Sequence, residues 1–221
     1  MTVAAILLAG GESSRMGQPK ALLEWGPGQT LIEYQIDELR QPPVERVIVV
    51  LGHRAEQIRP FAEKIECEVI VNGLYKRGRA SSVRTGARAL PEDTRTIVIL
   101  DVDQPRPRAA IHRLIENHIR ASSMITIPTF DGQRGHPAII DGWLLPELRR
   151  VRERTQGLRG LLEAHESDIL EIPFESDVVL LGMNTPAEYA EAKARYFSTD
   201  MQTPFKHSKD PPKAGHESAP D

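Results

Sequence analysis

Cysteine is almost absent from this sequence. The chain has 221 residues and a single cysteine, Cys67. One thiol can form no internal disulfide and cannot supply the several thiolates of a cysteine-based metal site. These absences exclude disulfide-stapled secreted folds and cysteine-ligated zinc folds, and they lead us to expect a protein of the reducing cytoplasm.

Long apolar segments and an excess of positive charge are also missing. No apolar run approaches the roughly 18 residues of a membrane-spanning helix, and the first residues lack the basic and apolar regions of a secretory signal. Lys and Arg number 28 against 31 Asp and Glu, which gives a formal net charge of −3. Nucleic-acid binding would need clustered Lys and Arg on a basic domain. The two tryptophans, Trp25 and Trp143, are too isolated to form a stacking platform. We therefore expect neither a membrane nor a nucleic-acid partner.

What the sequence does contain is an alternation of short apolar runs and amphipathic segments. The short apolar runs predict buried strands at 3–8, 47–51, 68–71, 96–100, 124–128, 169–172 and 178–181, and residues 137–140 form one further short apolar run. The apolar stripes predict helices at 30–39, 55–65 (interrupted near Pro60), 81–90, 108–119, 144–151, 158–165 and 186–197. This order implies a single-domain α/β fold, with a mostly parallel, doubly wound sheet and helices on both faces. Residues 199–221 have almost no apolar content, so we expect a disordered tail after a folded domain of residues 1–198.

A glycine-rich turn follows the first predicted strand. It reads LAGGESSRMGQPK, from Leu8 to Lys20. Glycine removes the Cβ that would block a phosphate, successive backbone N–H groups form an anion-binding concavity, and Arg15 and Lys20 add two cations. The glycine spacing matches neither GxxxxGK[ST] nor GxGxxG. The two adjacent glycines alone would be compatible with a tight turn and ordinary surface charges, but the whole pattern favours a triphosphate site.

This stretch resembles the signature of the nucleotidyltransferases related to molybdenum-cofactor guanylyl- and cytidylyltransferases, themselves relatives of the sugar-1-phosphate nucleotidyltransferases. The resemblance implies a Rossmann-like fold of the nucleotide-diphospho-sugar transferase type. It assigns nucleotide binding in this turn to Leu8, Ala9, Gly10, Gly11, Ser13, Arg15 and Lys20, and it gives Arg15 and Lys20 a catalytic role as well. The matched motifs extend from residue 4 to about residue 189.

Two acids, Asp101 and Asp103, follow the predicted strand 96–100. If the strand persists, residues i and i+2 point to the same side and could hold Mg²⁺, which takes one or two carboxylates plus phosphate oxygens and water. A solvated acidic turn is the alternative. The resemblance selects Asp103, within the D-x-P triplet ending at Pro105, as a catalytic, metal-binding acid and leaves Asp101 to orient water around the ion.

Asn184, followed by Thr185 and Pro186, is the second metal candidate implied by the resemblance. Taken alone, it would suit an Asn/Thr helix cap. Asn184, with Gly182 two positions earlier, is in part closer to the guanylyl pattern of the family. The family also uses an Asn, a Gly and serines near the nucleobase and sugar. Asn72, Gly78, Ser81 and Ser82 fill those positions here, and we select Ser82 as the contact residue among the serines.

A histidine before a proline is most often a loop residue, but Gly135, His136 and Pro137 resemble an element of cytidylyl-type members beside the acceptor substrate. Asp131 and Arg134 on the same loop are further candidates for the acceptor phosphate. Residues 156–159 resemble a glycine-rich helix start whose N-terminus attracts anions. His53 we interpret as structural.

Together these motifs predict a Mg²⁺-dependent nucleotidyltransferase that uses CTP in preference to GTP. The resemblance implies molybdopterin as the acceptor and a molybdoenzyme or its chaperone as a protein partner. Two alternatives stay open at this point. One is a nucleotidyltransferase acting on a sugar phosphate or another small phosphate, since fold does not fix the acceptor. The other is a non-catalytic nucleotide-binding regulatory module, which the presence of two metal candidates disfavours.

Overall fold

The computed structural model describes residues 2–198, so the predicted tail at 199–221 lies outside the described residues. Within residues 2–198 the chain forms one α/β domain with an eight-stranded sheet. The strands are β1 (Val3–Ala9), β2 (Arg46–Leu51), β3 (Glu68–Val71), β4 (Thr96–Asp101), β5 (Ile125–Phe130), β6 (Gln133–Arg134), β7 (Ala138–Asp141) and β8 (Ile169–Pro173). The helices are α1 (Leu31–Leu39), α2 (Ala55–Ala62), α3 (Arg79–Ala89), α4 (Arg108–Ala121), α5 (Leu145–Leu148), α6 (Gly157–Ala164) and α7 (Pro186–Tyr196).

The strands are ordered β3-β2-β1-β4-β7-β5-β6, and β8 pairs with β5. The first four strands of that order are parallel, as is the β5–β8 pair, whereas β7 runs antiparallel to both β4 and β5. The expected doubly wound and mostly parallel sheet is thus confirmed. Strand β1 lies in the middle, so the turn that follows it emerges at the centre of the sheet edge, where ligands bind in such folds.

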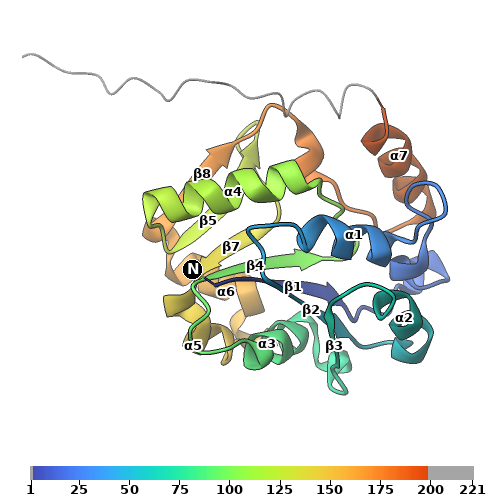
Figure 1. Cartoon of the computed structure of the whole chain (residues 1–221), viewed down its shortest axis with the longest axis horizontal. Helices are drawn as coiled ribbons and strands as arrows, with labels where there is room; N and C mark the ends of the chain where they lie inside the picture. The colour runs from blue at the N-terminus through green and yellow to red at the C-terminus, as the bar shows by residue number, and fades with distance from the viewer. Residues whose placement is uncertain (1, 199–221) are drawn as a thin grey trace, which may run out of the picture.

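Both faces of the sheet are covered, which explains why its strands are apolar at successive positions. In β1 all seven residues are buried, and they alternate between two cores. Val3, Ala5 and Leu7 pack toward α1, α2 and α4, while Ala4 and Ile6 pack toward α3, α5 and α6. Figure 1 shows α1 and α4 on one side of the sheet and α3 and α5 on the other.

The last helix, α7, is held against the start of the chain by aromatic rings. Trp25 is fully buried, and its ring lies 5.1 Å from that of Tyr196 and 6.3 Å from that of Tyr189. Thr185 caps this helix, as expected, by accepting a hydrogen bond from the backbone of Glu188 at 3.2 Å. This docking carries the residue just before the cap, Asn184, back to the glycine-rich turn.

Three of the predicted elements differ in the structure. Residues 178–181 were expected to form a strand, but residues Asp177–Leu180 form a 3₁₀ helix, whose first turn is capped by the Ser176 side chain. The helix expected at 144–151 is confined to Leu145–Leu148, after a 3₁₀ turn at Gly142–Leu144. Pro60 lies inside α2 and does not interrupt it. None of the helices in residues 2–198 has the length and apolar composition that a membrane crossing requires.

Candidate active site

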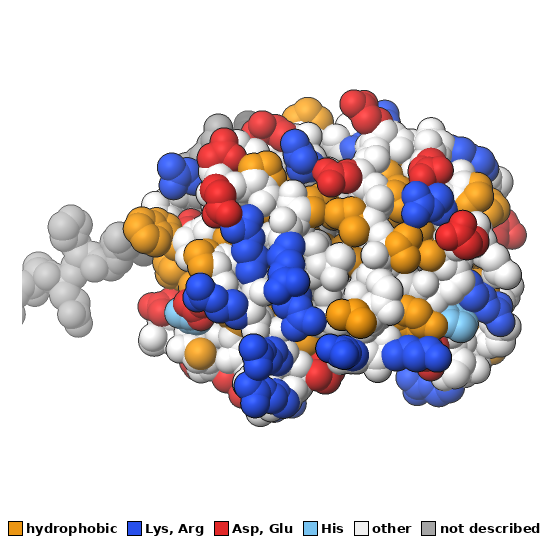
Figure 2. All heavy atoms as spheres, turned by 90° about the horizontal axis from the view of Figure 1, so that it is seen from below, with side chains coloured by type: hydrophobic (Ala, Val, Ile, Leu, Met, Phe, Trp, Pro, Cys, Tyr) orange, Lys and Arg blue, Asp and Glu red, His pale blue; other side chains and the backbone are white. Residues whose placement is uncertain are grey.

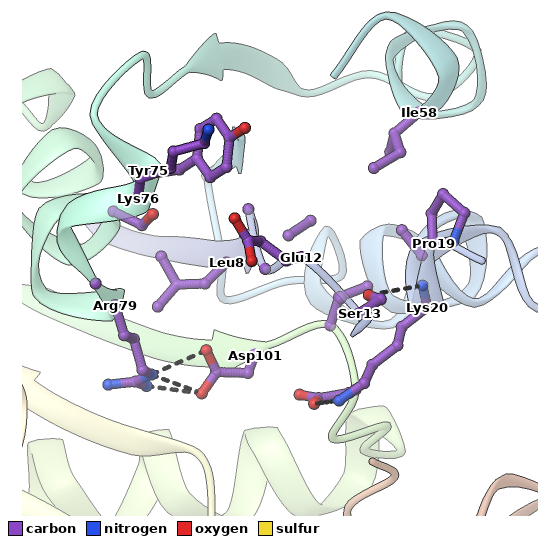
Figure 3. Close-up of a pocket in the computed structure, with 18 residues that line it drawn as sticks. Leu8, Glu12, Ser13, Pro19, Lys20, Ile58, Tyr75, Lys76, Arg79 and Asp101 are labelled. Atoms are coloured by element: carbon purple, nitrogen blue, oxygen red, sulfur yellow. Dashed lines mark hydrogen bonds and ion pairs between the residues drawn. The ribbon is translucent and has the colours of Figure 1, made fainter. Parts of the chain in front are cut away.

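A cavity of about 410 Å³ opens at the carboxyl ends of β1 and β4. The glycine-rich turn forms one of its walls, and the start of α3 and the residues before it form another. The end of β4 forms the base, as the close-up in Figure 3 shows. Ten of the residues singled out in the sequence line this cavity: Leu8, Ala9, Gly10, Gly11, Ser13, Lys20, Gly78, Ser82, Asp101 and Asp103.

The turn presents unused backbone donors. Within residues 2–198 the amide nitrogens of Gly11, Glu12 and Ser13 donate to no protein acceptor. Ser13 adopts φ 52°, and its hydroxyl accepts a hydrogen bond from the backbone of Lys20 at 3.2 Å. A run of free N–H groups beside a residue in the left-handed region is an arrangement that binds anions.

Lys20 brings together two side chains that are distant in the sequence. Its Nζ lies 2.6 Å from Oδ2 of Asp103 and 3.0 Å from Oδ1 of Asn184. The ammonium and the Asp103 carboxylate are both mostly buried, with side-chain exposures of 14% and 24%. The two residues selected as metal ligands therefore direct oxygen atoms at one point, which a cation already occupies.

The oxygen atoms at this point fit a hard divalent cation. Mg²⁺ binds carboxylate and amide oxygens and takes its remaining ligands from phosphates and water. Within residues 2–198 no group of three or more His, Cys, Asp or Glu side chains is placed to hold a metal without such help. Asp103 and Asn184 thus suit an ion that arrives with a nucleotide, provided that the Lys20 ammonium shifts toward the phosphates.

Asp101 does not share this point with Asp103. Strand β4 ends at Asp101, and the backbone turns at once, with the amide of Gln104 donating to the carbonyl of Asp101 at 3.0 Å. The expectation that both carboxylates project to one side of a strand is therefore wrong. The Asp101 carboxylate instead receives three hydrogen bonds of 2.7–3.0 Å from Arg79 (Figure 3). Burial is the largest single effect and lowers the pKa of Arg79, but the charge and hydrogen bonds of Asp101, together with the charges of Asp103 and Glu153, outweigh it and raise that pKa.

Asn72 lies behind the cavity wall and supports it. The side chain is 3% exposed, and its Nδ2 donates to the hydroxyls of Ser81 at 2.8 Å and of Ser82 at 3.0 Å. Only Ser82 of these three residues lines the cavity. The structure therefore places Asn72 and Ser81 where they can orient Ser82, while His53, expected to be structural, lies against the ring of Tyr75.

The segment Gly135, His136 and Pro137 lies outside the cavity lining but close to Asp103, whose charge acts on His136. Burial, with the charges of Arg106 and Arg79, lowers the pKa of His136 to about 4, so this imidazole is neutral near pH 7. Gly135 packs tightly there, because a Cβ would lie 2.3 Å from the carbonyl oxygen of Val179. The segment is thus fixed against residues 179–181, three positions before Asn184.

Arg106 holds the His136 segment against residues 179–181, and no motif in the sequence pointed to it. The side chain is fully buried and donates to four backbone carbonyls, those of Pro105, His136, Val179 and Leu181, at 2.7–2.9 Å. Burial lowers the pKa of Arg106 to about 9, so the guanidinium is still charged near pH 7, and these four oxygens accept its hydrogen bonds. One guanidinium therefore joins the three segments that carry Asp103, His136 and Asn184. No local pattern could have revealed this, because all four acceptors are main-chain atoms.

The remaining candidates lie outside the cavity. Arg15 is exposed, and its charge contributes to lowering the pKa of Glu188, whose carboxylate accepts from the backbone of Asn184 at 2.7 Å. Arg134, a candidate for the acceptor phosphate, is already paired with Glu166 and Glu171.

Eight residues that line the cavity were also not identified in the sequence: Glu12, Pro19, Ala21, Ile58, Tyr75, Lys76, Arg79 and Val102. Tyr75 and Lys76 belong to a 3₁₀ turn between two recognised motifs, so their nearness to Gly78 was the only available signal.

The chain has clear relatives. The family model of the MobA-like NTP transferase domain matches residues 5–169, a span that includes every candidate except Asn184. The molybdenum cofactor cytidylyltransferase of Escherichia coli (strain K12) is 29% identical over 192 residues, covering 86% of this chain and 95% of the relative. A probable molybdenum cofactor guanylyltransferase of Opitutus terrae is 37% identical over 193 residues, covering 84% and 92%. The crystal structure of Rv0371c from Mycobacterium tuberculosis H37Rv shares the fold, with a TM-score of 0.76 at 24% identity over 87% of this chain and 98% of that one.

Proposed function

Because the chain belongs to the MobA-like NTP transferase family and is a nucleotidyltransferase, we propose that it transfers a nucleoside monophosphate, from CTP in preference to GTP, to molybdopterin. An oxygen of the acceptor's phosphate attacks the α-phosphorus of the triphosphate, the bond to the bridging oxygen breaks, and pyrophosphate leaves. The observation that carries this proposal is the convergence of Lys20, Asp103 and Asn184 at the end of the glycine-rich turn.

The residues of the turn bind and orient the triphosphate. The free amides of Gly11, Glu12 and Ser13 supply donors to phosphate oxygens, and Lys20 neutralises charge on the β and γ groups. Arg15, exposed outside the cavity lining, would add a second positive charge. Charge builds up on phosphoryl oxygens in the transition state, so donors fixed in advance supply most of the rate acceleration. A phosphate nucleophile is already deprotonated near pH 7 and requires no general base.

Asp103 and Asn184 are the residues that would hold Mg²⁺. When bound, the ion supplies positive charge that stabilises the pentavalent phosphorus and the leaving pyrophosphate. The role of the protein is to keep the two oxygens in place. The backbone of Met183 does so by donating to the carbonyl of Asp103 at 3.1 Å, which ties the two ligand segments together.

The base and the acceptor are proposed from chemistry and resemblance. Ser82, Tyr75 and Gly78 form the side of the cavity that is left for the nucleoside once phosphates lie on the turn. The acceptor would bind beside the neutral imidazole of His136, on which the Asp103 charge acts. The element with His136 resembles cytidylyl-type members, and one relative is named a cytidylyltransferase, while Asn184 and the other relative point toward GTP. A molybdoenzyme or its chaperone is the receiver we expect for the product.

Pyrophosphate release tests the proposal. The chain is assayed with CTP, GTP, ATP and UTP in turn, each with Mg²⁺, with and without molybdopterin, and with glucose 1-phosphate as an alternative acceptor. We expect release that depends on molybdopterin and is faster with CTP than with GTP. A rate with GTP equal to or above that with CTP would overturn the choice of base. Release with the sugar phosphate alone would overturn the acceptor, and no release with any pair would overturn transfer itself.

A further inference from the structure

A second hollow, of about 530 Å³, lies between α3 and the segment that follows α5. Seven of the nine residues that line it are arginines. Three come from α3 and the turn before it, Arg77, Arg84 and Arg88, and four from the end of α5 and beyond, Arg149, Arg150, Arg152 and Arg154. Figure 2, seen from below relative to Figure 1, shows Lys and Arg side chains gathered in a band on this face. We call this hollow the arginine groove.

Two of these arginines are used in the fold. Arg149 donates to the carbonyls of Ala87 and Leu90 and pairs with Glu92, and Arg84 donates to the carbonyl of Val151 at 3.1 Å. The side chains of the other five arginines make no hydrogen bond or ion pair within residues 2–198, and all five are exposed. Like charges this close repel one another, so an anion in the groove would relieve an unfavourable arrangement.

The one acidic residue that lines the groove is already engaged. Oε2 of Glu153 accepts a hydrogen bond at 2.9 Å from the backbone of Ala80 in the first turn of α3, and its carboxylate packs against Gly78. Glu153 therefore contributes one negative charge against the seven arginines of the lining. The ninth residue, Ser81, is buried and directs its hydroxyl to the carbonyls of Leu74 and Gly78. Neither residue competes for the free guanidinium groups.

The lining also restricts what can bind. Sites for small organic ligands are mostly apolar, protein interfaces bury aromatic and aliphatic anchors, and single-stranded nucleic acid stacks its bases on aromatic rings. The arginine groove is lined by no apolar or aromatic residue. Its volume lies within the range of about 300–1,000 Å³ of small-molecule sites. A compact ligand bound by charge alone fits these conditions, and guanidinium forks match phosphate oxygens in pairs.

We propose that the arginine groove binds a compact polyphosphate anion, at a site distinct from the candidate active site. The groove lies next to the nucleotide cavity, because neighbouring residues line the two. Arg77 and Ser81 line the arginine groove, whereas Gly78, Arg79 and Ser82 line the nucleotide cavity. The source of the anion is either a free inorganic oligophosphate or the phosphate chain of a nucleotide. The inference rests on the groove alone and holds whichever base or acceptor the transferase uses.

Calorimetric titration of the full chain with inorganic tripolyphosphate tests the proposal. Lys20→Gln weakens binding in the active-site cavity, so the titration is done in that background. We expect one remaining site, and a loss of affinity of about tenfold or more when Arg88→Gln and Arg150→Gln are added. Raising the salt from about 0.05 M to about 0.5 M should weaken binding further, because the contacts are ionic. The matched control is Arg95→Gln with Arg120→Gln, two exposed arginines outside the groove.

Titrations with other ligands identify the source of the phosphate and test the alternatives to a polyphosphate ligand. CTP binding as tightly as tripolyphosphate, in a manner sensitive to the Arg88 and Arg150 substitutions, would support the site and identify the source as a nucleotide. Citrate binding equally well would overturn selectivity for phosphate. Groove-dependent binding of a thymidine oligonucleotide without binding of tripolyphosphate would overturn the proposal in favour of nucleic acid. An unchanged affinity in the Arg88 and Arg150 variant, with an unchanged melting temperature, would overturn the site.

Discussion

The ammonium of Lys20 lies 2.6 Å from a carboxylate oxygen of Asp103, across 83 positions of the sequence. This pair joins the end of the glycine-rich turn to the segment after β4, and the ammonium balances the Asp103 charge. Binding of a triphosphate with its metal would replace that balance, since phosphates would attract the ammonium and a cation would take its place at the carboxylate. The pair thus connects substrate binding to the assembly of the proposed metal site.

The first prediction compares Asp103 with Asp101. Asp103→Asn keeps the shape of the side chain but removes the charge that would hold the metal, so kcat should fall by about 10²–10³, corresponding to about 3–4 kcal/mol of transition-state stabilisation. Asp101→Asn frees Arg79 and should raise KM for the triphosphate more than it lowers kcat. Steady-state kinetics at saturating Mg²⁺ measures both. If Asp101→Asn is the more damaging to kcat, the metal belongs to Asp101.

The second prediction separates ligand access from packing at two glycines. A Cβ at Gly11 would meet no protein atom within 4 Å, so Gly11→Ala should melt like the wild type and yet bind triphosphate about tenfold more weakly or worse, because the methyl group blocks the phosphate. A Cβ at Gly52 would lie 2.7 Å from the carbonyl oxygen of Gly10, so Gly52→Ala should lower the melting temperature. Thermal melting with and without nucleotide distinguishes the two. Equal nucleotide affinity in Gly11→Ala and the wild type would argue against phosphate binding at the turn.

The third prediction concerns the buried guanidinium of Arg106. Arg106→Met removes four hydrogen bonds and leaves the carbonyls of Pro105, His136 and Leu181 without a donor, whereas that of Val179 still accepts from a backbone amide, so unfolding free energy should fall by about 3 kcal/mol or more. Arg106→Lys keeps the charge but cannot reach four acceptors from one nitrogen. Its free energy of unfolding should therefore lie between those of Arg106→Met and the wild type. The control is Arg108→Met, an exposed arginine paired with Glu38, which should cost about 1 kcal/mol or less. Urea unfolding measures all three, and a loss in Arg106→Met no larger than in the control would contradict this role.

The fourth prediction is a dependence of stability on pH. Burial lowers the pKa of His136 from 6.5 to about 4, so between these pH values the unfolded chain binds more protons than the folded one. The free energy of unfolding therefore has its full value with respect to this group above about pH 6.5. It decreases as the pH falls toward 4, by up to about 3 kcal/mol. His136→Gln should flatten this part of the curve, whereas His118, whose pKa is also lowered by burial, stays in both proteins and cancels in the comparison. Parallel curves for the two proteins would show that His136 does not titrate in this range.

The sequence by itself determined the sheet, its buried strands and the anion-binding turn. Apolar runs such as residues 3–8 are buried on both sides only when helices cover both faces of the sheet. The two glycines that follow β1, Gly10 and Gly11, favour a turn at the sheet edge. These are local requirements, so they can be predicted from neighbouring residues. Runs of four residues carry less information, and 178–181 became a 3₁₀ helix because the contacts of Val178 and Val179 with the core were met without pairing to a strand.

Only the tertiary structure decided how the site is assembled. The end of β4 decided which acid pairs with Lys20. Because the backbone turns after Asp101, Asp103 pairs with Lys20 and Asp101 pairs with Arg79. The position of Asn184 depended on the packing of Trp25 against Tyr196, which holds α7 against the start of the chain. The role of Arg106 depended on main-chain oxygens, which every residue possesses and no side-chain pattern identifies. Contacts between segments far apart in the chain are chosen by how the whole fold packs, and so they leave no trace in the local sequence.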